Sequence, residues 1–115
     1  MTTEIWHNPR CSKSRETLAL LRVNGIEPKV VLYKVSAPGE ADIRAVLMAL
    51  GKPALGLIRQ KDAAFKALGL AADADEGTLI AAMLAHPEII ERPVVRHNGK
   101  AALGRPPEDV LTLFG

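Results

Sequence analysis

The polar stretch at residues 7–15 separates two different hydrophobic patterns, and it limits how the chain can fold. The short segment at residues 3–6, which ends in the apolar pair Ile5-Trp6, predicts a strand. It ends before Pro9 because proline cannot continue a central ladder. Helical spacing of the apolar positions starts at about residue 12 and stops near residue 24, where Asn-Gly is typical of a helix end. Cys11, the only cysteine, lies between the two elements. The chain therefore begins with a βα unit that carries a thiol at its junction.

The rest of the chain predicts further strands around a helical block. Residues 29–33 form a β-branched, nearly continuous apolar run, which favours a strand that is covered on both faces and parallel to the first. Helical patterns follow at 40–50, 54–59, 62–68 and 76–85, so we expect a helical insertion at about 40–87 within an α/β frame.

The last part of the chain predicts a hairpin and a short helix. Strand patterns at 94–97 and 100–103 flank Asn98-Gly99, a strong hairpin signal because a type I′ turn needs positive φ at both central residues. Pro106 and the acids after it predict a short final helix that runs to about residue 113.

Length, charge and composition narrow the class of protein. A chain of 115 residues can form one hydrophobic core, so we expect a single domain over 1–115. The net charge of +2 comes without a basic run, which argues against nucleic acid and suits a small anion. No apolar run approaches the ~20 residues of a membrane span and no signal peptide is visible, so we expect a cytoplasmic protein without a membrane partner. One cysteine excludes an internal disulfide.

Cys11 has two interpretations. A free cysteine is often a small buried hydrophobe, but Arg10, Lys13 and Arg15 surround this one at a predicted helix start, where a thiolate is stabilised. The spacing to Ser14 is that of a dithiol redox motif with a hydroxyl in place of the second sulfur. Because a hydroxyl cannot form a disulfide, a thiol from another molecule must resolve any covalent state of Cys11.

The other candidate site residues are spread along the chain. His7 either stabilises the thiolate or packs as a strand-end histidine. Arg59, Arg92 and Arg105 each adjoin a proline or an apolar segment. An arginine side chain can bind a tetrahedral oxyanion through two parallel hydrogen bonds. The alternative for each is a solvated surface charge. Pro93 is either an edge marker or a cis-proline that faces the thiol.

The remaining histidines, His86 and His97, have no cysteine or carboxylate partners at metal-ligand spacing. We expect both at the surface, and no metal site.

Taken together, these residues resemble the glutaredoxin-coupled arsenate reductase family (ArsC-like), and most of all the branch that is named arsenate reductase by similarity. The likeness covers nearly the whole chain and is carried by His7-Asn8-Pro9-x-Cys11-x-x-Ser14-Arg15, Leu57-Ile58-Arg59, Glu91-Arg92-Pro93-Val94-Val95 and Gly104-Arg105-Pro106-Pro107-Glu108. The resemblance implies a thioredoxin-like α/β fold, with a mixed central sheet of about four strands and a helical insertion between the second and third strands.

The resemblance also implies the reduction of arsenate to arsenite. In that family a thiolate at the position of Cys11 attacks arsenate and forms a covalent adduct, glutathione adds to the arsenic, and glutaredoxin removes the glutathione as arsenic(V) becomes arsenic(III). His7 and Ser14 would help to activate the thiol. The implied oxyanion site contains Arg59, Arg92 and Arg105, and we place Asn8 in it as well. Glutathione would be a co-substrate, and no cofactor would stay bound.

Two alternatives to arsenate reduction remain open. In a glutathione-linked thiol transferase, the same arginines would hold the glutathione carboxylates. A non-catalytic thioredoxin-like regulator that binds RNA polymerase would use a Cys-x-x-Cys switch, and Ser14 counts against that switch because it removes the second sulfur.

Overall fold

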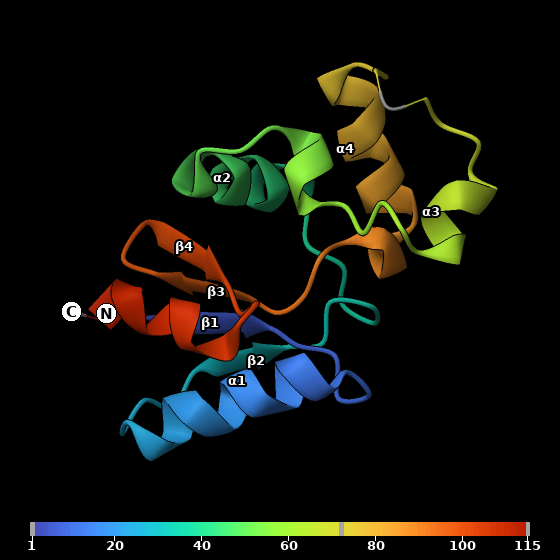
Figure 1. The fold of residues 1–115 in the computed structure, drawn as a ribbon. Coiled ribbons are helices and arrows are strands. Elements are labelled where there is room, and N and C mark those ends of the chain that lie inside the picture. Colours follow the sequence, from blue (N-terminus) through green and yellow to red (C-terminus); the bar gives the residue numbers. More distant parts are fainter. Residues whose placement is uncertain (1, 72, 115) are drawn as a thin grey trace. The chain divides into compact units, whose positions relative to one another are not determined.

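The computed structural model describes residues 2–71 and 73–114, and residues 1, 72 and 115 lie outside the description. The chain divides into two compact units, of which the first combines Met1–Ser36 with Arg92–Gly115 and the second is Ala37–Glu91. The first unit carries the sheet, and the second is built mainly of helices (Figure 1). The second unit corresponds closely to the insertion that the sequence predicts at about 40–87. The single domain over 1–115 stays a prediction.

The first unit contains a four-stranded mixed sheet of order β2-β1-β3-β4. The strands are β1 (Thr3–Trp6), β2 (Lys29–Val31), β3 (Val94–His97) and β4 (Lys100–Leu103). β1 is parallel to β2 and antiparallel to β3, which is antiparallel to β4. This arrangement confirms the thioredoxin-like fold, with the helical segment inserted between the second and third strands.

The prediction that residues 29–33 form a strand covered on both faces is wrong. β2 ends at Val31 and lies at the edge of the sheet. The side chains of Val30 and Leu32 are 37% and 42% exposed. Periodicity cannot tell an edge strand from a central one, because strand order depends on contacts far along the chain. The fully covered strands are the inner ones, with buried side chains at Ile5, Trp6, Val94 and Val95.

Helix α1 (Ser12–Val23) connects β1 to β2 and buries one face, formed by Ser14, Thr17 and Leu21. Its end agrees with the predicted stop. Gly25 adopts a positive φ of 77°, and the N–H of Ile26 donates to the carbonyl of Leu21 at 2.9 Å. This bond satisfies a carbonyl that the helix would otherwise leave unpaired.

The hairpin of β3 and β4 has the turn that its sequence predicts. Asn98 and Gly99 have φ values of 50° and 76°, as a type I′ turn requires. The register pairs His97 with Lys100 and Val94 with Leu103. The hairpin therefore brings the residues before β3 next to those after β4.

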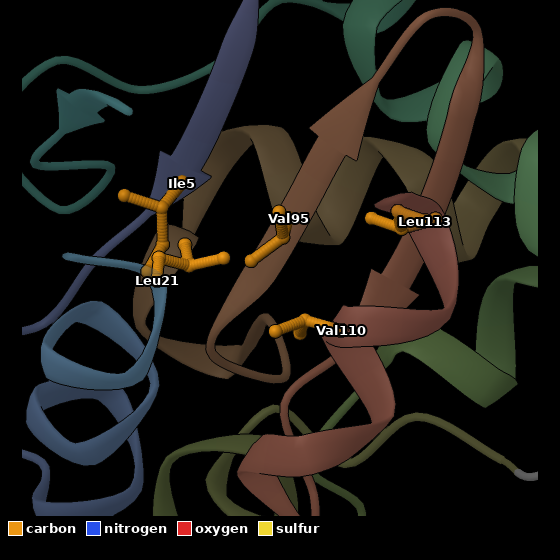
Figure 2. Packing of buried hydrophobic residues seen from close by; sticks show 5 residues of the cluster. All are labelled: Ile5, Leu21, Val95, Val110 and Leu113. Carbon is orange, nitrogen blue, oxygen red and sulfur yellow. The ribbon is translucent and has the colours of Figure 1, made fainter. Parts of the chain in front are cut away.

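The hydrophobic core of the first unit lies between the sheet and two helices (Figure 2). Ile5 of β1 and Val95 of β3 are paired in register. Leu21 comes from α1, and Val110 and Leu113 come from η3 (Pro107–Phe114). Burial of each such side chain contributes about 1.5–3 kcal/mol. The final helix is present as predicted, but it is a 3-10 helix and starts at Pro107 instead of Pro106.

The second unit consists of α2 (Glu40–Leu50), η1 (Ala54–Leu57), α3 (Ala63–Ala67), α4 (Glu76–Ala85) and η2 (Pro87–Ile89). The predicted bounds of α2 and α4 are confirmed. The predicted helix at 54–59 is too long, because Ile58 leaves it to form an isolated antiparallel bridge with Ile90. Aspartate side chains cap two helices, with Asp62 accepting from the N–H of Ala64 and Asp75 from the N–H of Thr78.

His97 is not the plain surface residue that we expected. Its Nδ1 lies 2.9 Å from Oγ1 of Thr3, and its ring centroid lies 4.5 Å from that of Phe114. Strand pairing and the final helix thus partly cover it. His86 lies in the second unit with its Nδ1 3.4 Å from a carboxylate oxygen of Glu88.

Within the described residues, every helix is too short or too polar to cross a membrane.

Gly104 occupies a position where the backbone approaches two other elements. Its N–H donates to the carbonyl of Pro93 at 3.0 Å. A Cβ at Gly104 would lie 2.7 Å from Cγ of Pro93, and it would clash with the side chain of Thr17 as well. Thr17 is buried, and its hydroxyl donates to the carbonyl of Lys13 at 2.8 Å. Glycine is therefore required here for space.

We expect Gly104→Ala to lower the free energy of unfolding by about 1–3 kcal/mol, since overpacking forces neighbours to move. Urea denaturation measures this change. Gly77→Ala is the matched control, because its new Cβ would meet only Asp75 Oδ1 at 3.6 Å. Alanine also favours the helix by up to ~1 kcal/mol, so the control should be at least as stable as wild type. Equal stability of Gly104→Ala and wild type would contradict the close approach.

Candidate active site

Cys11 is the N-cap residue of α1. Its backbone is extended, with φ −95° and ψ 123°, and its carbonyl accepts the N–H of Arg15 at 3.0 Å. Its own N–H donates to the carbonyl of Asn8 at 3.0 Å, which closes the loop after β1. The thiol is 9% exposed. The predicted position at the strand-to-helix junction is confirmed, and it places the sulfur at the positive end of the helix.

Two arginines of the same unit converge on this sulfur. The side chain of Arg92 donates a hydrogen bond to it, and Nη2 of Arg105 lies 3.7 Å from Sγ. Nε of Arg105 also donates to the carbonyl of Arg92 at 2.7 Å, which holds the two residues together. The hairpin explains this pairing, because extending the register from Val94 and Leu103 places residue 92 opposite residue 105.

The pKa of Cys11 is lowered from the ordinary value of a thiol. Burial raises this pKa, but the N–H of Ser14, the hydrogen bond and charge of Arg92, and the N–H of Lys13 together lower it by more. The sulfur makes no short capping hydrogen bond, so these N–H groups stabilise its anion electrostatically. The thiolate stabilises the fold above the ordinary thiol pKa, and this contribution is lost as pH falls through the lowered value.

His7 and Ser14 form a buried polar pair beside Cys11. Nδ1 of His7 lies 2.6 Å from Oγ of Ser14, and the same Oγ accepts the N–H of Asn8 at 3.0 Å. Burial, followed by the charges of Arg22 and Arg15, lowers the pKa of His7 and favours its neutral form. The contact described for His7 is therefore with Ser14, whose N–H faces the sulfur. Its role in activating the thiol stays a prediction.

The loop between β1 and α1 is held by its own polar groups. Oδ1 of Asn8 accepts the N–H of Arg10 at 3.0 Å, and Nη1 of Arg15 donates to the carbonyl of Pro9 at 2.9 Å. Sequence reasoning missed this role of Arg15, although its position one turn into α1 could have indicated it. The substrate role of Asn8 stays a prediction.

Pro93 follows Arg92 through a cis peptide bond, and the Arg105-Pro106 bond is cis as well. Pro93 is buried and directly precedes β3. Of the two predictions for Pro93, the cis-proline is the one found in the structure.

Arg59 belongs to the second unit, so its predicted place at the thiol stays a prediction. Its Nη1 lies 2.6 Å from Oδ2 of Asp62, and its N–H donates to the carbonyl of Ile89 at 2.8 Å. The predicted site residues of the first unit that contact Cys11 or one another are His7, Asn8, Cys11, Ser14, Arg92 and Arg105. In residues 2–71 and 73–114, no group of three or more His, Cys, Asp or Glu side chains could hold a metal ion.

Known proteins resemble this chain over nearly its whole length. A family model described as ArsC family matches residues 6–113. The chain is 52% identical over 114 residues to the uncharacterized protein YfgD of Escherichia coli K12, covering 97% of this chain and 96% of that protein. It is 44% identical over 109 residues to a Neisseria meningitidis protein named arsenate reductase, covering 93% of each. The solved structure of an arsenate reductase from Vibrio cholerae matches with a TM-score of 0.94, at 43% identity and 98% coverage of each chain.

We expect Arg92→Ala to raise the pKa of Cys11, because it removes both a hydrogen bond and a positive charge from the thiolate. The rate of alkylation by iodoacetamide as a function of pH measures this pKa. Lys13→Ala is the matched control. It removes a cation whose Nζ lies 3.6 Å from a carboxylate of Glu16 at the surface, and it keeps the N–H that faces the sulfur. An unchanged alkylation profile in Arg92→Ala would show that the guanidinium does not stabilise the thiolate.

We expect Ser14→Ala to lower the free energy of unfolding by about 1–3 kcal/mol, because it leaves the N–H of Asn8 and the ring of His7 without this buried partner. Ser12→Ala, in the same turn but exposed, should leave stability nearly unchanged. Urea denaturation compares the two variants. Equal stability of both would contradict a structural role of the Ser14 hydroxyl.

Proposed function

Because the chain belongs to the ArsC family, we propose that it reduces arsenate to arsenite, with the thiolate of Cys11 as the nucleophile. The observation that carries this proposal is the convergence of Arg92 and Arg105 on a sulfur at the start of α1. A nucleophile with a lowered pKa and two guanidinium groups within reach suit an anionic, tetrahedral substrate. Relatives named arsenate reductase support the choice of arsenate.

Arsenate binding falls to the guanidinium groups. Arg92 and Arg105 neutralise the oxyanion and hold its arsenic close to the sulfur, which would otherwise repel it. Asn8 contributes to this site from the loop after β1. Arg59 is assigned to oxyanion binding by its Leu57-Ile58-Arg59 motif alone. Because the carbonyl of Arg92 accepts the Nε of Arg105, the two side chains are oriented before the substrate arrives.

The first two steps build a mixed adduct at arsenic(V). The thiolate of Cys11 forms a bond to arsenic, and one arsenate oxygen is protonated from solution and leaves as water. The thiol of glutathione then forms a second sulfur-arsenic bond, and a second oxygen leaves as water. Neither step changes the oxidation state of arsenic.

The next two steps transfer electrons and release the product. A glutaredoxin thiol attacks the glutathione sulfur, a disulfide forms between them, and the electron pair of the broken sulfur-arsenic bond stays on arsenic, which becomes arsenic(III). Water then displaces Cys11 and arsenite leaves. Ser14 cannot supply the attacking sulfur, so the second electron donor comes from another molecule.

His7 and Ser14 act as positioning residues in this scheme. The N–H of Ser14 faces the sulfur, and its hydroxyl is held by His7 and Asn8. These bonds hold the first turn of α1 in the orientation that stabilises the thiolate.

We therefore assign the protein to the oxidoreductases of arsenic detoxification. Glutathione is most abundant as a free thiol in reducing compartments, so we place the protein in the cytoplasm.

We expect arsenite production from arsenate, glutathione and glutaredoxin to disappear in Cys11→Ser and to fall by about 10²-fold in Arg92→Ala, as for other lost oxyanion donors. Speciation of arsenic by chromatography measures arsenite directly. Lys13→Ala serves again as the control and should keep wild-type activity.

Two results would contradict this proposal. Arsenite production that Cys11→Ser leaves unchanged would exclude the nucleophile. Faster turnover of a glutathione mixed disulfide than of arsenate would favour the thiol transferase instead. Replacement of glutaredoxin and glutathione by thioredoxin tests the electron donor separately from the reduction itself.

A further inference from the structure

A cleft of about 250 Å³ lies beside the loop that carries Cys11, entirely within the first unit. One wall is the start of that loop, from His7 to Arg10, and the other is the turn after β2, with Leu32, Lys34 and Val35. The two walls follow the carboxyl ends of the parallel strands β1 and β2. Ligands of open α/β sheets commonly bind at such strand ends.

The cleft combines an apolar surface with two cations. Its apolar residues are Pro9, Leu32 and Val35. Val35 is 84% exposed, although a valine side chain is more stable when it is buried. Arg10 and Lys34 contribute positive charge, and no acidic residue lines the cleft. His7 also lines the cleft, and burial lowers its pKa, which favours its neutral form. A ligand with carboxylates around a small, uncharged centre matches these groups.

The cleft lies on the other side of the Cys11 loop from the two arginines. β1, which leads into the loop, is placed between β2 and β3. Arg92 and Arg105 flank the hairpin that begins with β3, whereas the cleft adjoins β2. A ligand in the cleft therefore does not compete with an oxyanion held by the two arginines.

We propose that this cleft binds the glutathione that attacks the arsenic adduct, with Arg10 and Lys34 holding its terminal carboxylates. The inference rests on the proposed function for the use of glutathione. Ligand pockets usually measure about 300–1,000 Å³, so a cleft of about 250 Å³ holds only part of the tripeptide. The rest of it, including the thiol, extends towards Cys11.

The test uses S-methylglutathione, which cannot react, and the Cys11→Ser protein. Backbone amide shifts of Leu32 and Val35 in NMR titrations report its dissociation constant. We expect Arg10→Ala and Lys34→Ala each to weaken binding roughly two- to fivefold, as for single exposed ion pairs. The dimethyl ester of S-methylglutathione should bind more weakly than S-methylglutathione to the protein that keeps Arg10 and Lys34. Lys29→Ala is the matched control, since it removes an exposed cation of β2 outside the cleft.

The coupled assay separates this inference from the proposed function. With active enzyme, Arg10→Ala and Lys34→Ala should raise the KM for glutathione and leave the KM for arsenate unchanged. Arsenite production with an unchanged KM for glutathione in both variants would overturn the cleft and leave the reductase standing. Binding of S-methylglutathione that depends on Arg10 and Lys34, without any arsenite production, would support the cleft and overturn the proposed reductase function. Amide shifts caused by reduced glutaredoxin but not by S-methylglutathione would assign the cleft to a protein and overturn the proposal.

Discussion

Stabilisation of one sulfur anion at the start of α1 is the constraint on which the candidate site depends. Burial alone would raise the pKa of Cys11. The N–H groups of Ser14 and Lys13, together with Arg92, lower it instead, and these N–H groups face the sulfur because Cys11 holds an extended backbone directly before the helix. That conformation requires the strand to end and the chain to turn within a few residues. Pro9 ends the strand here, because proline cannot continue the ladder. The bond between His7 and Ser14 then ties the end of β1 to the first turn of the helix. Local structure thus sets the chemistry of the thiol.

The β3-β4 hairpin supplies the second half of the site. Because Asn98 and Gly99 fix a two-residue turn, the register places residue 92 opposite residue 105 at the open end. Gly104 and Pro93 are the neighbours of these two arginines, and they approach each other closely. A larger residue at position 104 would push against Pro93 and against Thr17 of α1. The same turn that forms a stable hairpin therefore determines how far apart the two guanidinium groups lie. A change of one residue in its length would disperse them.

The sequence predicts those features of the fold that depend on neighbouring residues. Asn98-Gly99 identifies the hairpin, and Cys11 with its cations identifies the thiol. The sequence does not predict features that depend on contacts between residues far apart in the chain. The apolar run of β2 lies at an edge because β3, far along the chain, takes the other side of β1. The need for glycine at position 104 depends on α1 and Pro93 in the same way. Arg59 shows the same limit, since its motif predicts a role but not a place.

Ser14 connects the activation of the thiol to its dependence on a partner. A second cysteine at this position could resolve the adduct internally, but it could not readily accept the N–H of Asn8 and bond to His7 as the hydroxyl does. The chain thus uses the position to order the first turn of α1. Under the proposed function, the electrons then come from another molecule, and its thiol needs a path that the bound oxyanion leaves open. The sheet order provides one, because the arginines adjoin β3 while the exposed apolar residues adjoin β2. The proposed glutathione cleft would account for the exposure of Leu32 and Val35.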